Sequence, residues 1–348
     1  MVETEKLAEG DADTGTAAIL TPIEASFLHV LNEFASHGFV DCLDEEAITS
    51  ALLGGVTAVL PLAAKEFGSG TADTTQCAWG GYNKSSSSDL RSNESDRGAD
   101  FALALWQSDA EMRIALFQAK AGKTSKDGKR NFLDVHRRPD DPNPLGTPED
   151  KREPWRRPQM AILFRTGAMF EFAKELYKPD SYAADGQDLL QYAEVKADAE
   201  LSRSQEEIHR TAAKLGWVHY LAYFSNEMKA VPMSAMTDAV SRQCKADASG
   251  VCNVDITDVG VNSFTAVIRR GVIDGPGDVA GWLVLPSVLA RDLLPKLVDI
   301  MPVYIGRGRG GLGLNIGDWK ELVDAPSSSD VQLRAGVAMR ATPPGRKL

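Results

Sequence analysis

The spacing of apolar residues predicts two helices at the start of the chain. The first follows the cap sequence Thr21-Pro22 and ends at Gly38. The second begins near Asp44, and its apolar stripe contains Ile48, Leu52, Val56 and Val59. The Ser-, Gly- and Asn-rich stretch from Thr71 to Arg97 then predicts a loop, with one short strand around Cys77 to Trp79.

Part of the second helix also has the length of a membrane span. Residues 47–64 contain no charge over 18 positions. Gly54, Gly55 and Pro61 interrupt the stretch, however, and its mean apolarity is low for a membrane helix. A buried helix followed by a turn is therefore the better prediction, and we expect no membrane association.

Two short apolar runs predict an antiparallel hairpin. Phe101–Trp106 and Arg113–Lys120 are separated by the polar stretch Gln107-Ser108-Asp109-Ala110-Glu111. Further along, the pattern predicts a helix over about 159–176, a polar helix over about 187–215, a strand over 217–224, one or two strands over 254–270, a helix over 286–298 and a glycine-rich hairpin or loop over 303–314.

Composition changes this picture in three ways. The four cysteines show no CxxC spacing, so a zinc knuckle or a disulfide framework is not expected and a reducing cytoplasm fits. The acidic N-terminus lacks the order of a secretory signal and predicts a disordered tail. The net charge of −11 argues against a non-specific nucleic-acid coat protein, although an enzyme with a local basic face remains compatible with it.

The hairpin brings polar residues together at its open end. With the turn centred on Asp109, Asp100 faces Gln118, and directly opposed residues have Cβ atoms roughly 4.5–5.5 Å apart. Gln118 and Lys120 share one face, because strand side chains repeat every two residues. Asp100, the Gln118 amide oxygen and the Ala119 carbonyl would suit a hard divalent cation, and Lys120 would orient water and offset charge on a phosphate.

These residues resemble a known signature. The segments GADFALAL, from Gly98, and IALFQAK, ending at Lys120, are similar to the D…(D/E)xK motif of PD-(D/E)xK nucleases. They are most similar to the QxK variant of Mrr-like restriction enzymes and related bacterial defence nucleases. The family core is a helix, a three-stranded meander, a second helix and a fourth strand, and the resemblance covers roughly residues 41–228. Ala99 replaces the usual proline, and Gln118 replaces an acid, which removes one negative charge.

The resemblance implies further site residues and a metal. An additional glutamate from the first family helix would be Glu45 or Glu46, and Glu45 is preferred because it shares a face with Thr49 and Leu52. Glu94 resembles an acidic position before the GAD motif, and Gln159 would line the site from the next helix. The cofactor implied is Mg²⁺ or Mn²⁺. For Glu45, Glu46, Glu94 and Gln159, a solvated surface position is the alternative.

Basic residues follow the predicted site. The segment after Lys120 carries the candidate nucleic-acid-binding residues Lys123, Lys126, Lys129, Arg130, Arg156 and Arg157. A solvated loop is the alternative interpretation.

A glycine-rich segment and a histidine are not expected to belong to a catalytic site. GRGRGG at Gly306 fits the GxGxxG pattern, but Gly313 and Gly317 break the helix that a dinucleotide site requires next. No nicotinamide or flavin cofactor is therefore expected, and the loop would touch nucleic acid or a partner. His219 lies within a predicted strand and is expected to be a core residue.

The sequence thus predicts an α/β protein: a restriction-endonuclease-like mixed sheet core flanked by helices, with an α+β C-terminal extension. The expected units are an acidic tail (1–20), a nuclease-like domain (21–228), an extension of unknown role (229–340) and a tail (341–348). The expected function is metal-dependent hydrolysis of DNA in restriction or anti-phage defence, with DNA as partner and a homodimer left open. The alternative is a catalytically silent nucleic-acid-binding or interaction module with the same fold.

Overall fold

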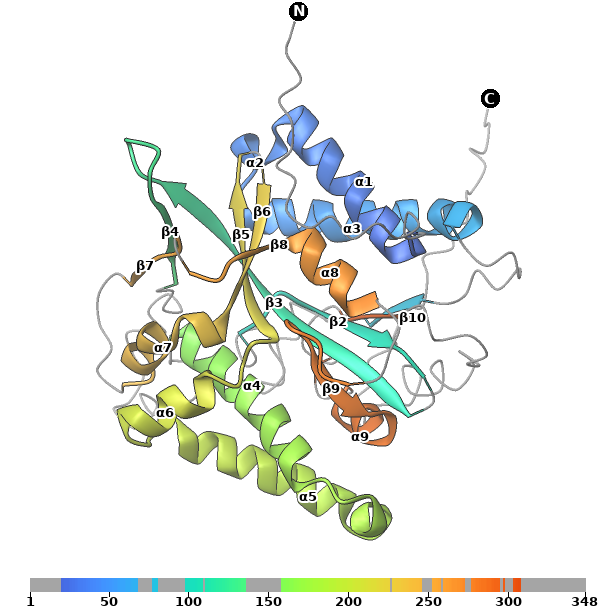
Figure 1. Ribbon diagram of the computed structural model, residues 1–348, viewed down its shortest axis with the longest axis vertical. Coiled ribbons are helices and arrows are strands. Elements are labelled where there is room, and N and C mark those ends of the chain that lie inside the picture. The colour runs from blue at the N-terminus through green and yellow to red at the C-terminus, as the bar shows by residue number, and fades with distance from the viewer. Residues whose placement is uncertain are drawn as a thin grey trace, which may run out of the picture.

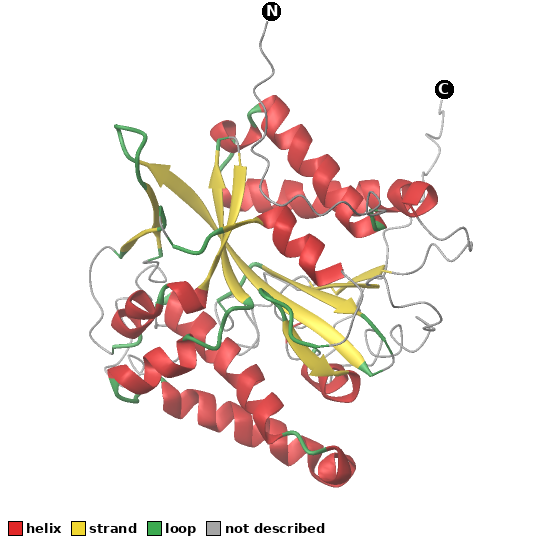
Figure 2. Cartoon of the chain, in the orientation of Figure 1, coloured by secondary structure: helices red, strands yellow, loops and turns green. Residues whose placement is uncertain are grey.

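A computed structural model describes residues 20–67, 77–80, 98–108, 110–135, 158–225, 227–245, 252–257, 259–272, 277–294, 297 and 303–307. These residues form an α/β fold in which a mixed sheet separates two groups of helices (Figures 1 and 2). The helices are α1 (Pro22–His37), α2 (Phe39–Cys42), α3 (Glu45–Phe67), α4 (Gln159–Leu176), α5 (Pro179–Glu200), α6 (Gln205–Ala212), η4 (Met233–Ala235), α7 (Thr237–Gln243), α8 (Phe264–Val272) and α9 (Ser287–Leu293). The strands are β1 (Cys77–Gly80), β2 (Phe101–Trp106), β3 (Glu111–Thr124), β4 (Asn131–Asp134), β5 (Val218–Phe224), β6 (Glu227–Pro232), β7 (Asn253–Asp255), β8 (Asn262–Ser263), β9 (Leu283–Pro286) and β10 (Val303–Arg307).

The sheet has a hydrophobic core on each face, because neighbouring strand residues point to opposite sides. Along β3, Ala115 and Phe117 belong to the core that α1, α3 and α8 cover. Ile114 and Leu116 belong to the core that α4, α5, α6, α7 and α9 cover. Burial on both faces explains why β2 is apolar throughout rather than alternating, and β5, which includes His219, is likewise buried along its whole length.

The strand order along the main path of the sheet is β1-β10-β2-β3-β5-β6-β8. The β2–β3 hairpin is antiparallel, β3 and β5 are parallel, and β10 runs parallel to β2. The short strand expected near residue 77 exists as β1, but it pairs with β10, which lies between β1 and β2. A late segment of the chain therefore separates the first strand from the hairpin.

The long strand β3 connects the parts of the sheet. Its first residues pair with β9, its middle with β2 and β5, and its last three residues with β4. The ends of β3 and β4 project away from the helices (Figure 1). The strand β4 was not expected from the sequence, where residues 121–157 have a loop-like composition.

The first predicted helix is confirmed as α1. Thr21 and Glu24 form a reciprocal capping box, and Gly38 ends the helix with a φ of 62°. The second is confirmed as α3, which starts at Glu45. The turn predicted near Pro61 is wrong, because α3 continues to Phe67. Proline has no N–H group, so the carbonyl group of Thr57, four residues earlier, lacks its helical donor. Both residues are exposed, and water can hydrogen bond to this carbonyl group.

By length and composition, α3 is the one helix of the described ranges that could cross a membrane. In this fold it packs one face against α1 and the sheet, where Ile48, Leu52 and Val56 are buried. Leu62, on its other side, is 70% exposed.

Two predicted elements differ in type or extent. The polar helix expected over 187–215 is two helices, α5 and α6, because Ser204 begins a new capping box with Glu207. Part of the stretch expected as strand over 254–270 is the helix α8, while β7 and β8 are short. Phe264, Val267 and Ile268 of α8 are buried, which is the spacing of one helical face.

The C-terminal half contributes to the same sheet. The boundary expected after residue 228 falls within β6, which pairs with β5 as a hairpin. Strands β8, β9 and β10 then pair with β6, β3 and β2, respectively. The acidic tail expected over 1–20 and the tail expected over 341–348 lie, apart from Leu20, outside the described residues.

Candidate active site

Asp100 lies at the open end of the β2–β3 hairpin, as the sequence predicted. The strands pair Phe101 with Phe117, which is the register that places Asp100 across from Gln118. Asp100 Oδ2 accepts hydrogen bonds from Gln118 Nε2 and from the backbone N–H of Ala119, both over 2.7 Å. The hairpin geometry therefore brings Asp100, Gln118 and Ala119 into direct contact.

Gln118 is fully buried and uses both ends of its amide. Its Nε2 donates to Asp100 Oδ2 and, over 3.1 Å, to the carbonyl oxygen of Ala119. Its Oε1 accepts from Gln159 Nε2 over 2.9 Å. Gln159, at the first position of α4, thus lines the site as the resemblance implied.

Lys120 is paired with Glu45, the first residue of α3. Lys120 Nζ lies 3.0 Å from Glu45 Oε1, and Glu45 Oε2 accepts from the backbone N–H of Ala121 over 3.1 Å. The Lys120 side chain is only 7% exposed, so its ammonium group depends on this carboxylate for charge compensation. Of the two candidate glutamates, Glu45 is the one at Lys120, whereas Glu46 is exposed.

Thr49 and Tyr223 hold the start of α3 over the sheet. Thr49 Oγ1 donates to the carbonyl oxygen of Glu45 over 2.8 Å, so the hydroxyl of Tyr223, 2.9 Å from Thr49 Oγ1, must supply the proton of that contact. Burial raises the pKa of Tyr223 above its ordinary value, which keeps it a neutral donor. Tyr223 was not among the site residues predicted from the sequence, although its alternation with Leu221 in the predicted strand places it on the α3 side.

Gly98 allows the segment Gly98-Ala99-Asp100 to lie close to α4. It adopts a φ of +71°, and a Cβ built on it would lie 2.7 Å from Leu163 N and 2.8 Å from Gln159 O. Only glycine has both the left-handed conformation and the missing side chain that this contact needs. The glycine of the GAD segment therefore brings Asp100 close to Gln159.

Tyr220 is a second residue that sequence analysis missed. It pairs with Gln118 across the parallel β3–β5 ladder, and both side chains are buried. Its hydroxyl has no hydrogen-bond partner among the described residues. Burial, together with the nearby Cys252 and the carboxylates of Asp100 and Glu45, raises the pKa of Tyr220 well above its ordinary value.

His219, on the opposite face of β5, is a core residue as expected. Its ring stacks on Phe117 with centroids 5.2 Å apart, and its Nε2 lies 2.9 Å from the carbonyl oxygen of Gly281. Burial lowers the pKa of His219 from 6.5 to about 4; the hydrogen bond to Gly281 opposes this shift and the charge of Arg270 adds to it.

The residues present fit a divalent cation in type but not yet in orientation. Among the described residues, no three His, Cys, Asp or Glu side chains form a metal-binding group. Asp100 Oδ2 and the Ala119 carbonyl oxygen nevertheless both contact the Gln118 amide, which now presents its NH₂ group to them. Oxygen atoms of a carboxylate, an amide and a backbone carbonyl are the donors that hard cations take. The donor set therefore fits if the Gln118 amide turns its oxygen to this side.

Four of the predicted basic residues lie on the end of β3 and in the turn that follow this centre in the chain. Lys123 is in β3, three positions beyond Lys120, and Lys126, Lys129 and Arg130 follow in the β3–β4 turn; all four are exposed. Asp127 in the same turn accepts hydrogen bonds from Ser125 Oγ and the backbone N–H of Lys129. We call residues 121–134 the basic ribbon. Arg156, Arg157 and Glu94 lie outside the described residues, as does most of the GRGRGG segment, of which Gly306 and Arg307 end β10.

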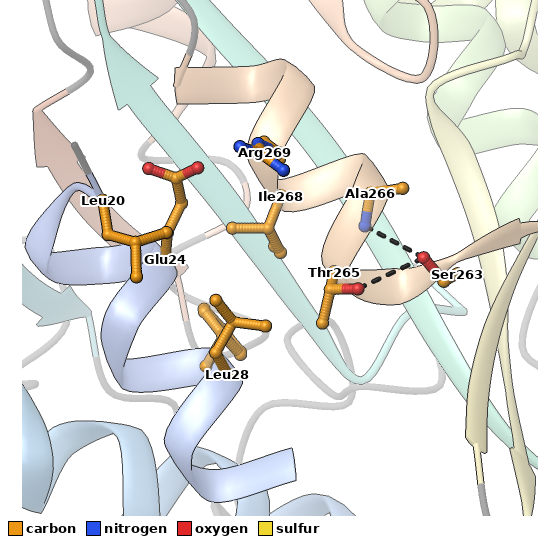
Figure 3. A pocket seen from close by; sticks show the side chains of 9 residues that line it. Leu20, Glu24, Leu28, Ser263, Thr265, Ala266, Ile268 and Arg269 are labelled. Atoms are coloured by element: carbon orange, nitrogen blue, oxygen red, sulfur yellow. Dashed lines mark hydrogen bonds between the residues drawn. The ribbon is translucent and has the colours of Figure 1, made fainter. Parts of the chain in front are cut away.

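A separate pocket of about 260 Å³ lies between α1 and α8 (Figure 3). Its lining includes Glu24 and Leu28 of α1, Arg269 of α8, and Ser263, whose Oγ accepts from Ala266 N at the start of α8. None of the predicted catalytic residues is among those that line it.

Comparison of the chain with protein-family models, with curated proteins and with solved structures finds no match.

Proposed function

We propose that this chain is a divalent-metal-dependent endonuclease of the restriction-endonuclease-like type that hydrolyses DNA, with a role in restriction or anti-phage defence. The observation that carries the proposal is the convergence of Asp100, Gln118 and the Ala119 carbonyl next to the Lys120–Glu45 pair. It is supported by the succession α3, β2–β3 hairpin, α4 and β5, in which the hairpin stands where the resemblance implies a three-stranded meander; β1 does not extend the hairpin, because β10 lies between β1 and β2.

Each residue has a distinct task in this proposal. Asp100, the Gln118 amide oxygen and the Ala119 carbonyl would hold Mg²⁺ or Mn²⁺, which when bound supplies polarisation of the phosphate and of the attacking water. Lys120 offsets the negative charge that develops on the phosphate oxygens. Glu45 keeps the buried ammonium group of Lys120 paired and directed before substrate arrives.

The basic ribbon supports DNA as the substrate. The chain as a whole carries a net charge of −11, so a polyanion needs a local cationic surface. The ribbon offers Lys123, Lys126, Lys129 and Arg130 on β3 and the β3–β4 turn, where all four are exposed and can contact DNA phosphates, while β7 pairs with the other edge of β4. Lys123 lies three residues beyond Lys120, roughly 10 Å along the strand, so a duplex on the ribbon would reach the candidate centre.

The test of activity is plasmid cleavage with Mg²⁺ or Mn²⁺. We expect cleavage by the wild type and its loss in Asp100→Ala and Lys120→Ala. The exposed Asp188→Ala and Lys178→Ala are matched controls that should cleave normally. Thermal unfolding of each variant separates lost chemistry from lost folding. Cleavage that survives substitution of both Asp100 and Lys120 would refute the site, and no cleavage by the wild type with either metal would refute the activity.

A second candidate function is a catalytically silent DNA-binding module. It is favoured by the satisfied hydrogen bonds of Asp100 Oδ2 and of both ends of Gln118 without a metal. This module would bind DNA through the ribbon and cleave nothing.

Binding is tested separately from cleavage. We expect Lys126→Glu with Lys129→Glu to weaken duplex binding in fluorescence anisotropy. The slope of log K against log salt should fall by about 2, because each DNA phosphate that a lysine neutralises contributes about 0.9 to it. Lys65→Glu with Lys178→Glu makes the same charge change at exposed positions away from the ribbon. Equal weakening by the two pairs would show that net charge, not the ribbon, governs binding.

A further inference from the structure

Gln159 holds the Gln118 amide in one of its two orientations. Gln159 Nε2 donates to Gln118 Oε1, so Gln118 directs its own Nε2 to Asp100. The other end of the Gln159 amide, Oε1, is buried and has no hydrogen-bond partner among the described residues. Because a buried acceptor without a donor is costly, this oxygen requires an explanation.

The chemistry of its neighbours fixes how Gln118 is turned. Asp100 Oδ2 and Ala119 O are both acceptors, so the group that contacts them over 2.7 and 3.1 Å must be NH₂. A divalent cation bound beside Asp100 Oδ2 and Ala119 O requires the opposite orientation, because it binds the amide through its oxygen. Gln118 must therefore rotate its terminal amide by half a turn before it can serve as a ligand.

Rotation of Gln118 forces rotation of Gln159. When Gln118 Oε1 faces the cation, Gln118 Nε2 faces Gln159, and two NH₂ groups cannot hydrogen bond to each other. Gln159 must then present its Oε1, which is the buried oxygen that now lacks a donor. The ligating arrangement thus gives Gln159 Oε1 a donor, and the NH₂ group of Gln159 takes the buried position that Oε1 occupies in the metal-free arrangement.

We propose that Gln118 and Gln159 form a coupled amide pair that gates divalent-metal binding at Asp100. In the metal-free state Gln159 keeps the NH₂ group of Gln118, instead of its oxygen, directed to Asp100, and binding turns both amides together. Gln159 is a positioning residue in this scheme. The inference rests on the proposed metal-dependent function and names how its metal site is regulated.

The test measures Mn²⁺ affinity without DNA, by electron paramagnetic resonance of free Mn²⁺ or by calorimetry. Gln159→Glu replaces the donor by an acceptor and favours the ligating orientation of Gln118. We expect Mn²⁺ to bind about tenfold more tightly, which corresponds to about one hydrogen bond of ordinary strength. The added charge also attracts the cation, so the same substitution is made in the Gln118→Met background, which has no amide to turn. There the gain should fall to the charge effect alone.

A second measurement uses the wild-type sequence. In protein labelled with ¹⁵N at the glutamine side chains, Mg²⁺ should shift the NH₂ resonances of Gln118 and Gln159 along one titration curve. Gln159→Met identifies the Gln159 resonance. This measurement decides the question even if Gln159→Glu folds poorly.

The outcomes separate the two proposals. Equal gains in both backgrounds, or a Gln159 resonance that stays in place while Gln118 shifts, would overturn the coupled pair and leave the nuclease proposal standing. Absence of Mn²⁺ binding by the wild type, or binding that persists in Asp100→Asn, would overturn the metal site and the coupled pair with it.

Discussion

Replacing Gly98 by alanine tests the close approach on which the candidate site is built. The left-handed φ of +71° costs an L-residue about 1 kcal/mol or more. In addition, the new Cβ would lie 2.7 Å from the Leu163 backbone nitrogen, about 0.7 Å inside the ordinary contact distance of 3.4 Å. Backbone cannot turn aside as a side chain can, so the first turn of α4 must move. We expect Gly98→Ala to lower the free energy of unfolding by about 2–4 kcal/mol.

The chain contains a matched control for this substitution. Gly128 has the same φ of +71°, and a Cβ on it would meet nothing within 4 Å. Gly128→Ala should therefore cost only the conformational part, about 1 kcal/mol. Urea unfolding of the two variants measures the difference. If Gly98→Ala and Gly128→Ala destabilise the protein equally, the close approach of Gly98 to α4 is not a source of stability, and the reasoning is refuted.

The buried groups give three further predictions. Burial lowers the pKa of His219 from 6.5 in the unfolded chain to about 4 in the folded chain. The contribution of the neutral side chain to the free energy of unfolding is therefore fully present above pH 6.5 and is lost as the pH falls toward 4. Urea unfolding should show a loss of about 2 kcal/mol between pH 7.5 and pH 5, and His219→Phe should remove that slope. Tyr223→Phe should cost about 1 kcal/mol in the same assay by removing the hydrogen bond to Thr49, and no loss would show that this hydrogen bond does not hold α3. Gln118→Glu places a second carboxylate against Asp100 and should lower stability in EDTA by about 1–3 kcal/mol, with recovery in millimolar Mg²⁺; a variant with the same melting temperature in EDTA and Mg²⁺ would contradict a metal site there.

Local pattern was sufficient to place the hairpin and its polar end. Two apolar runs around a short polar break set the register, and the period of two residues then set which side chains share a face. The contact between Asp100 and Gln118 follows from these two facts alone. In the same way, the cap residues Thr21 and Gly38 marked both ends of α1, since capping depends on neighbours in sequence.

The sequence by itself therefore determined the hairpin, its register and the helix ends, because hydrogen bonds and side-chain alternation over a few residues decide these features. Tertiary packing decided the rest. It brought Glu45, which the helical face already favoured, to Lys120 by seating Thr49 on Tyr223, and it placed β10 between β1 and β2. It also made residues 264–272 a helix, where one apolar face could cover the sheet. Such outcomes depend on surfaces that meet only after distant segments have folded together.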